Sequence, residues 1–332
     1  MTAPVAAAPT TRRGLGVPRV GGLGQELLLL VAIISLFAFV GWMNPRFLSQ
    51  NNMTAIFVGN AYIAVAAIGM SMVIISGHID VSIGALIGVL ATVSGLIVTN
   101  GYPIWLAWLA PLLVGGAINA LVGALIAYAR VPSIIATLAM LSILRGGLIV
   151  ATGGAWISGL PPGFQLAQFR LLQVPSPVWF MIAMTILAAL LLRHTAFGRS
   201  IYAVGSNPEA AEASGIAYKP TIVKVFALHG VIGGIAAVLF ATQLQVIQST
   251  VPNGLELIII TASVVGGVSI LGGIGTVIGS TLAAILFATI GASLIFLNVS
   301  AYWLRAVQGV LILTTVLADM ARRKKTGGGR SR

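Results

Sequence analysis

The sequence predicts an all-α, polytopic membrane protein, a helical bundle of about ten transmembrane helices with both termini in the cytoplasm. The 332 residues are 58% hydrophobic and only 7% charged, with a mean hydropathy of +1.05, whereas soluble domains carry about 25% charged residues. Apolar runs recur at nearly the length that a membrane helix needs, about 20 residues. These runs show no polar–apolar alternation, so they indicate helices and exclude a β-barrel.

Ten apolar runs define the expected elements, with Gly and Pro at most of the joints, such as Asn44-Pro45 and Gly272-Gly273. They are 25–42, 54–76, 80–98, 104–128, 134–152, 177–193, 222–243, 256–271, 274–297 and 301–319. Residues 1–24 read as a disordered cytoplasmic tail, 25–319 as a single transmembrane domain and 320–332 as a basic cytoplasmic tail. The run after Gln25 shows no small-residue cleavage site, so it is predicted to be an uncleaved first span.

The distribution of Lys and Arg predicts the orientation. With the N-terminus in the cytoplasm, 14 of the 18 cations lie inside, three lie outside and Arg145 lies within a span. The inside cations are Arg12, Arg13, Arg19, Arg130, Arg193, Arg199, Lys219, Lys224, Arg322, Arg323, Lys324, Lys325, Arg330 and Arg332, and the outside ones are Arg46, Arg170 and Arg305. The eighth span is short and the joint at 77–80 is tight, so either is open to being a re-entrant or broken helix.

Composition also limits the chemistry. The net charge of +12 comes from cations at span ends, so nucleic-acid binding is not expected. The absence of cysteine excludes disulfides, thiolate catalysis and cysteine-ligated metal. His78, His194 and His229 are scattered and form no metal-ligand spacing, and no phosphate-binding loop is present. We therefore predict no catalytic residues, no metal site and no cofactor in this chain.

Charged residues within the apolar depth are few and mark either a pathway or a buried pair. Asp80 stands at a helix start, where capping of free N–H groups is favoured over contact with a solute. Glu256 has the same preferred interpretation, and Arg145 is equally compatible with locking helices together and with binding a ligand. So few intramembrane acids argue against ion-coupled transport, although a secondary carrier of small polar solutes remains the alternative function.

The cytoplasmic segment 194–221 holds Glu209 and Glu212, two of the chain's six acidic residues. Asn207 is the expected N-cap of a short helix, with Pro208 at its first position and Gly215 at its end. A self-capped helix with a surface of small residues is suited to lie in a groove of a soluble partner. A solvated loop helix without a partner is the alternative.

Four ordered motifs resemble those of bacterial ABC-transporter permeases of the ribose type. GRSIYAVGSN at 198–207, with AA at 210–211 and SGI at 214–216, resembles their cytoplasmic loop. SGHIDVSIG at 76–84 is similar to G-G-I-D-L-S-V-G, PSIIATL at 132–138 with LRG at 144–146 is similar to P-x-F-I-A-T-L with L-R-G, and GGVSILGGIG at 266–275 is similar to G-G-x-S-x-x-G-G-x-G. The resemblance extends over nearly the whole chain after the N-terminal tail.

The resemblance implies the inner-membrane subunit of a sugar importer. Two permease subunits, identical or related, would form the pathway, a periplasmic or lipid-anchored solute-binding protein would deliver the solute, and cytoplasmic ABC ATPases would hold ATP-Mg and drive alternating access. The contact with the ATPase would be made by Gly205, Asn207, Pro208, Glu209, Ala210, Ala211, Gly215 and Ile216. The permease itself would not be an enzyme.

His78 departs from the ribose-type pattern, which usually has a second glycine at this position. The outer loop TGGAWISGLP at 152–161 looks like that of autoinducer-2 permeases, and rhamnose permeases belong to the same branch, so this branch is favoured over ribose without a choice within it. Candidate residues of the translocation pathway are Asn60, His78, Asp80, Asn119, Arg145, Gln243 and Glu256.

Overall fold

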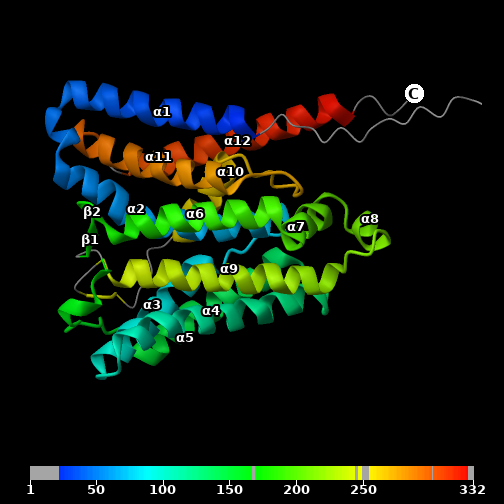
Figure 1. Cartoon of the computed structure of the whole chain (residues 1–332), viewed down its shortest axis with the longest axis horizontal. Coiled ribbons are helices and arrows are strands. Elements are labelled where there is room, and N and C mark those ends of the chain that lie inside the picture. The colour runs from blue at the N-terminus through cyan, green and yellow to red at the C-terminus, as the bar shows by residue number, and fades with distance from the viewer. Residues whose placement is uncertain (1–21, 167–168, 244–245, 249–253, 301, 328–332) are drawn as a thin grey trace, which may run out of the picture.

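The computed structural model describes residues 22–166, 169–243, 246–248, 254–300 and 302–327. Its helices run side by side along the long axis of one bundle (Figure 1). The α-helices are α1 (Gly22–Met43), α2 (Gln50–Ile75), α3 (Ile83–Thr99), α4 (Ile104–Ala127), α5 (Ser133–Thr152), α6 (Ser176–His194), α7 (Ala196–Ser206), α8 (Pro208–Ala213), α9 (Tyr218–Ala241), α10 (Leu255–Val265), α11 (Val277–Phe296) and α12 (Trp303–Gly327). Two 3-10 turns, η1 (Pro45–Leu48) and η2 (Pro162–Phe164), and a small antiparallel pair, β1 (Arg170–Leu171) and β2 (Val174–Pro175), complete the described elements.

Each of the ten predicted apolar runs overlaps a helix, which confirms a polytopic helical membrane protein. Within the described residues, seven helices are long and apolar enough to cross a membrane: α1, α2, α4, α5, α6, α9 and α11. Three shorter apolar helices lie in Ile83–Thr99, Leu255–Val265 and Trp303–Leu317. The count of ten spans therefore stays a prediction.

Helix α10 has 11 residues, and at 1.5 Å per residue it is about 16 Å long. That is roughly half the hydrocarbon thickness of a membrane. Helix α10 is therefore too short to cross the membrane alone. This length fits the broken or re-entrant helix that the sequence left open for the eighth span.

Two terminal boundaries differ from the sequence prediction. Helix α1 begins at Gly22, inside the segment predicted to be a disordered tail, and the remainder of that segment, 1–21, lies outside the described residues. Helix α12 continues through Gly327, beyond the predicted end at 319. Arg and Lys are good helix formers, so the basic residues after 319 extend the helix instead of ending it.

Helix α2 is the centre of the bundle, since its side chains from Ala61 to Ile75 are buried on every face. Helices α6, α9, α10 and α11 pack around it. Helices α4 and α9 approach each other closely through glycines: a Cβ on Gly230 would overlap the Gly115 carbonyl, and one on Gly123 would meet Phe226 at 2.8 Å. Small residues allow such close helix packing in membranes.

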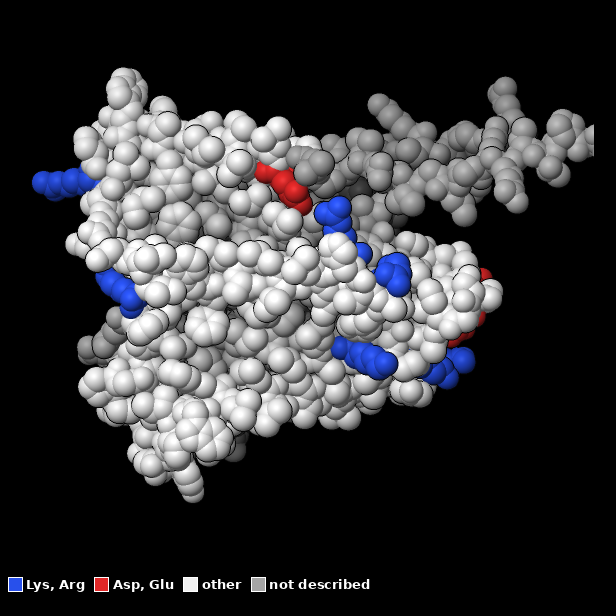
Figure 2. All heavy atoms as spheres, in the orientation of Figure 1, with Lys and Arg blue, Asp and Glu red and all other residues white. Residues whose placement is uncertain are grey.

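The two ends of the bundle differ. Helices α7 and α8 lie at one end, and the β1–β2 pair lies at the other (Figure 1). In the view of Figure 2, most of the described Lys and Arg side chains gather at the α7–α8 end. The bundle is thus strongly asymmetric in charge along its axis.

Candidate functional site

Helix α8 is capped at both ends by its own residues. The Asn207 side-chain oxygen accepts a hydrogen bond from the Ala210 N–H at 3.0 Å, and Pro208 occupies the first helical position. Gly215 has φ +83°, the left-handed conformation that favours glycine. The predicted N-cap, first-position proline and glycine stop are confirmed.

The C-terminal end of α8 forms a complete Schellman motif. The Gly215 N–H donates to the Glu212 carbonyl, and the Ile216 N–H donates to the Ala211 carbonyl, both at 2.9 Å. Ala211 is buried, whereas Glu209 and Glu212 are exposed. Helix α8 is therefore a preformed, acidic projection at the end of the bundle (Figure 1).

Helix α7, which the sequence analysis did not predict, connects α8 to the bundle. Thr195 caps its start by accepting a hydrogen bond from the Gly198 N–H at 2.9 Å. Near its end, the Tyr202 hydroxyl donates to the Gly275 carbonyl at 2.8 Å. Burial raises the pKa of the Tyr202 phenol above its ordinary value, so the group stays a neutral donor.

The end of α7 packs directly against two other parts of the bundle at Gly205. A Cβ at this position would overlap the Ile75 carbonyl oxygen at the end of α2 and would lie 2.9 Å from the Gly273 nitrogen. The same Ile75 carbonyl accepts a hydrogen bond from the Gly273 N–H at 2.8 Å. We call Ile75, Gly205, Gly272 and Gly273 the glycine junction. The lack of a Cβ at its three glycines allows the three backbones to approach so closely.

Asp80 is the centre of a buried polar cluster. Its Oδ1 accepts hydrogen bonds from the Ser82 N–H at 2.8 Å and the Ser82 hydroxyl at 2.5 Å, so it caps the start of α3 as the sequence favoured. Its Oδ2 accepts from the Asn119 amide at 3.1 Å and lies 3.4 Å from His229 Nε2. Asp80, Asn119 and His229 are all 0% exposed, so the cluster joins α3 to α4 and α9 away from any opening.

Arg145 and Glu256 form an ion pair between α5 and α10. Arg145 Nη2 lies 3.1 Å from each carboxylate oxygen, and the two side chains are 31% and 10% exposed. The pairing favours the helix-locking interpretation of Arg145. For Glu256 the sequence favoured capping of a helix start. In the structure its carboxylate instead pairs with Arg145 on α5.

The other predicted pathway residues have hydrogen-bond partners outside these two groups. Asn60 donates to the Ile56 carbonyl within α2 at 2.9 Å, and the Gln243 amide donates to the Val58 carbonyl at 2.7 Å. His78 Nε2 lies 3.0 Å from the Tyr218 hydroxyl at the start of α9. No group of three or more His, Cys, Asp or Glu suited to a metal occurs in the described part of the chain.

Comparison with known proteins identifies the family. Residues 52–316 match the family described as the permease component of branched-chain amino acid transport systems. The chain belongs to this permease family. It is similar to the autoinducer 2 import system permease protein LsrC of Salmonella typhi, with 36% identity over 89% of this chain and 85% of the relative. LsrC of Yersinia enterocolitica is 37% identical and LsrC of Shigella flexneri is 34% identical, each over 89% of this chain and over 82% and 86% of the relative. The comparison with solved structures found no match.

The chain is accordingly a multi-pass inner-membrane permease of an ABC importer, and its family is not itself catalytic. Membership implies ATPase and binding-protein partners. The resemblance that the four motifs carried is confirmed.

His78 should make the stability of the permease depend on pH. Burial lowers its pKa from 6.5 to about 4, so between these values the unfolded chain binds a proton that the folded chain does not. Stability should therefore fall as the pH falls from 6.5 to 4, by an amount on the order of 2 kcal/mol. Thermal unfolding of the purified permease in detergent across this range measures the effect.

The matched control is the exposed His194. His78→Asn should flatten the dependence on pH, and His194→Asn should leave it unchanged. Equal slopes for the native permease and His78→Asn would contradict a neutral, half-buried His78.

Two features of the site escaped sequence reasoning. The first is His229 as the partner of Asp80. A carboxylate buried in a membrane needs a partner, so the sequence did indicate that Asp80 has one. The contact of Gly205 with Ile75 joins segments far apart in the chain, and no periodicity or spacing reports such a contact.

Proposed function

We propose that the permease is one of two membrane subunits, identical or related, that import a small polyhydroxylated solute of the autoinducer-2 class. Similarity to the LsrC permeases over nearly 300 residues supports this class. Rhamnose and ribose are the other members of the proposed range. A separate binding protein delivers the solute, and a separate ATPase holds ATP-Mg.

The proposed contact with the ATPase is α8 together with Gly205 and Ile216. The observation that carries this proposal is the glycine junction, which packs the end of α7 against the end of α2 and the turn at 272–273. Because these backbones touch without intervening side chains, a displacement of α8 moves parts of the bundle that are distant in sequence. Packed elements of this kind shift as units instead of deforming continuously.

The proposed topology has ten spans with both termini in the cytoplasm. The cations at the α7–α8 end (Figure 2) support this orientation, because loops on the cytoplasmic side are enriched in Lys and Arg. The same end is then the one that a cytoplasmic ATPase reaches.

The proposed pathway residues fall into two classes by burial. Arg145 is partly exposed and would meet the solute together with its partner Glu256, and Asn60 and Gln243 would contribute from α2 and from the segment after α9. Asp80 and Asn119 are sealed in this conformation, and we propose that they and His78 act on the pathway by fixing the start of α3 and its contacts with α4 and α9.

Gly215→Val should uncouple the importer while the chain still inserts into the membrane. The φ of +83° costs a β-branched residue roughly 1–2 kcal/mol, although a Cβ there meets no atom within 4 Å. The expected result is loss of the defined α8 end and a strong fall in solute uptake at normal membrane abundance. The matched control is Gly153→Val at the end of α5, which has φ +61° and equally open space. Full uptake by Gly215→Val would count against the role of α8.

The function is tested with the permease, its ATPase and its binding protein assembled in proteoliposomes. Autoinducer-2, rhamnose and ribose are supplied in turn, and ATP hydrolysis and uptake are measured together. We expect both rates to rise with one of these solutes and to require all components. Uptake by the permease alone, driven by an ion gradient, would instead establish a secondary carrier.

A further inference from the structure

The ion pair between Arg145 and Glu256 is held by a single guanidinium nitrogen. Arg145 Nη2 meets both carboxylate oxygens at 3.1 Å, and the buried Arg145 Nε has no hydrogen-bond partner among the described residues. The strong arrangement for Arg and a carboxylate uses two parallel N–H donors. This pair therefore leaves part of the hydrogen-bonding capacity of Arg145 unused.

Glu256 packs against α3, whereas Arg145 is on α5. A Cβ on Gly84, in the first turn of α3, would lie 2.5 Å from Glu256 Oε2 and 3.0 Å from the Glu256 nitrogen. The start of α10 thus rests against α3, at a position where only glycine fits. The ion pair connects α5 to this α3–α10 unit.

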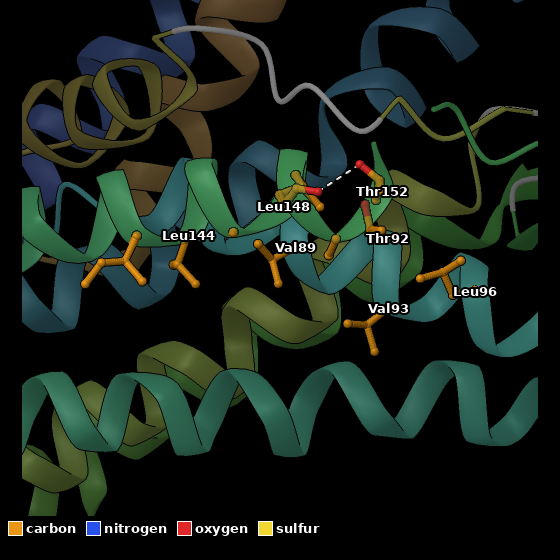
Figure 3. Close-up of a pocket in the computed structure, with 10 residues that line it drawn as sticks. Val89, Thr92, Val93, Leu96, Leu144, Leu148 and Thr152 are labelled. Carbon is orange, nitrogen blue, oxygen red and sulfur yellow. Dashed lines mark hydrogen bonds between the residues drawn. The ribbon is translucent and has the colours of Figure 1, made fainter. Parts of the chain in front are cut away.

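A partly open cavity of about 300 Å³ lies between α3 and α5, and Leu144, the residue before Arg145, lines it. Val89, Thr92, Leu144 and Leu148 face it from the two helices (Figure 3). Thr92 is 3% exposed, and its hydroxyl oxygen has no partner within the described part of the chain. This space leaves α3 and α5 incompletely packed against each other, so α5 has room to move toward α3.

We propose that the Arg145–Glu256 ion pair is a latch that holds α5 against the α3–α10 unit and opens during each transport cycle. This inference rests on the proposed function. Within the apolar depth both charges need partners, and in the resting state each supplies the partner of the other. A polyhydroxylated solute, or water that enters with it, offers hydroxyl groups to both charges, so its arrival lowers the cost of separating α5 from α10.

The test uses a single cysteine as a reporter of the cavity, because the chain has no cysteine of its own. Thr92→Cys is introduced into the assembled importer in detergent, and its rate of labelling by N-ethylmaleimide is measured. The same measurement follows in combination with Glu256→Gln, with Glu256→Asp and with the exchanged pair Arg145→Glu and Glu256→Arg. The control reporter is Ser94→Cys, on the α4 side of α3, where the Ser94 hydroxyl donates to the Ala107 carbonyl.

The latch predicts that Glu256→Gln raises labelling of Thr92→Cys roughly tenfold, that Glu256→Asp raises it less, and that the exchanged pair restores the slow rate. Labelling of Ser94→Cys should stay slow throughout. Hydrolysis of ATP without solute should rise in Glu256→Gln for the same reason.

Equal labelling of Thr92→Cys in all variants would overturn the latch. An equal rise at both reporters would also overturn it, since it would indicate general loosening. These outcomes are distinct from failure of the proposed function, which would appear as absence of ATP-dependent uptake by the native assembly.

Discussion

Gly205→Ala is expected to abolish most solute uptake by the assembled importer. Its methyl group would overlap the Ile75 carbonyl oxygen and crowd the Gly273 nitrogen, two backbone atoms that a rotamer change cannot move. Overpacking of this kind typically costs about 1–3 kcal/mol. The strain falls on the contact that joins α7 to the end of α2, so we expect uptake to fall about tenfold or more.

The control for Gly205→Ala is Gly59→Ala within α2, where an added Cβ meets no atom within 4 Å. That variant should be as stable as the native permease or slightly more stable, because Ala favours helices over Gly. Membrane abundance, thermal unfolding in detergent and uptake are compared for the two variants. Native uptake by a normally folded Gly205→Ala would show that the glycine junction does not transmit movement.

Asp80→Ala is expected to have the largest effect on folding. It removes the acceptor for the Ser82 N–H and hydroxyl and for the Asn119 amide, and it leaves His229 without its carboxylate. Because the cluster is fully buried, none of these groups can turn to water. Breaking a buried pair on one side typically costs 3–5 kcal/mol, so little folded protein should accumulate in the membrane.

Asp80→Asn provides the graded comparison, since it keeps an acceptor oxygen of similar shape and loses only the charge. It should retain more folded protein than Asp80→Ala. An Asp80→Ala variant with native stability and a changed solute concentration dependence of uptake would instead place Asp80 in contact with the solute.

The sequence predicted those elements that depend only on residues close together in the chain. The Asn207–Pro208 start and Gly215 stop of α8 depend on side chains and backbone angles within one short segment, and the structure confirms them. The apolar runs likewise predicted the helices, because membrane helices must be apolar and satisfy their own backbone. The capping of α3 by Asp80 was readable for the same reason.

Contacts between helices that are far apart in the chain could not be predicted from the sequence. Asp80 with His229, Arg145 with Glu256 and Gly205 with Ile75 each join segments separated by more than 100 residues. The first two pairs had a physical signal, since isolated buried charges are costly, but the sequence offered several possible partners. The start of α1 and the end of α12 extend beyond the predicted apolar runs because the change in composition there does not coincide with a loss of helix propensity.

The central claim is that a separate ATPase contacts α8 and drives transport through it. Site-specific cross-linking in the working importer tests this claim most directly. A cysteine at the exposed Glu209 carries a photoreactive group, and the control carries it at the exposed Gln50, at the opposite end of the bundle. The coupled ATPase is expected to be captured from Glu209 and not from Gln50, with uptake lost on capture. An active assembly in which α8 captures no ATPase would contradict the proposed coupling.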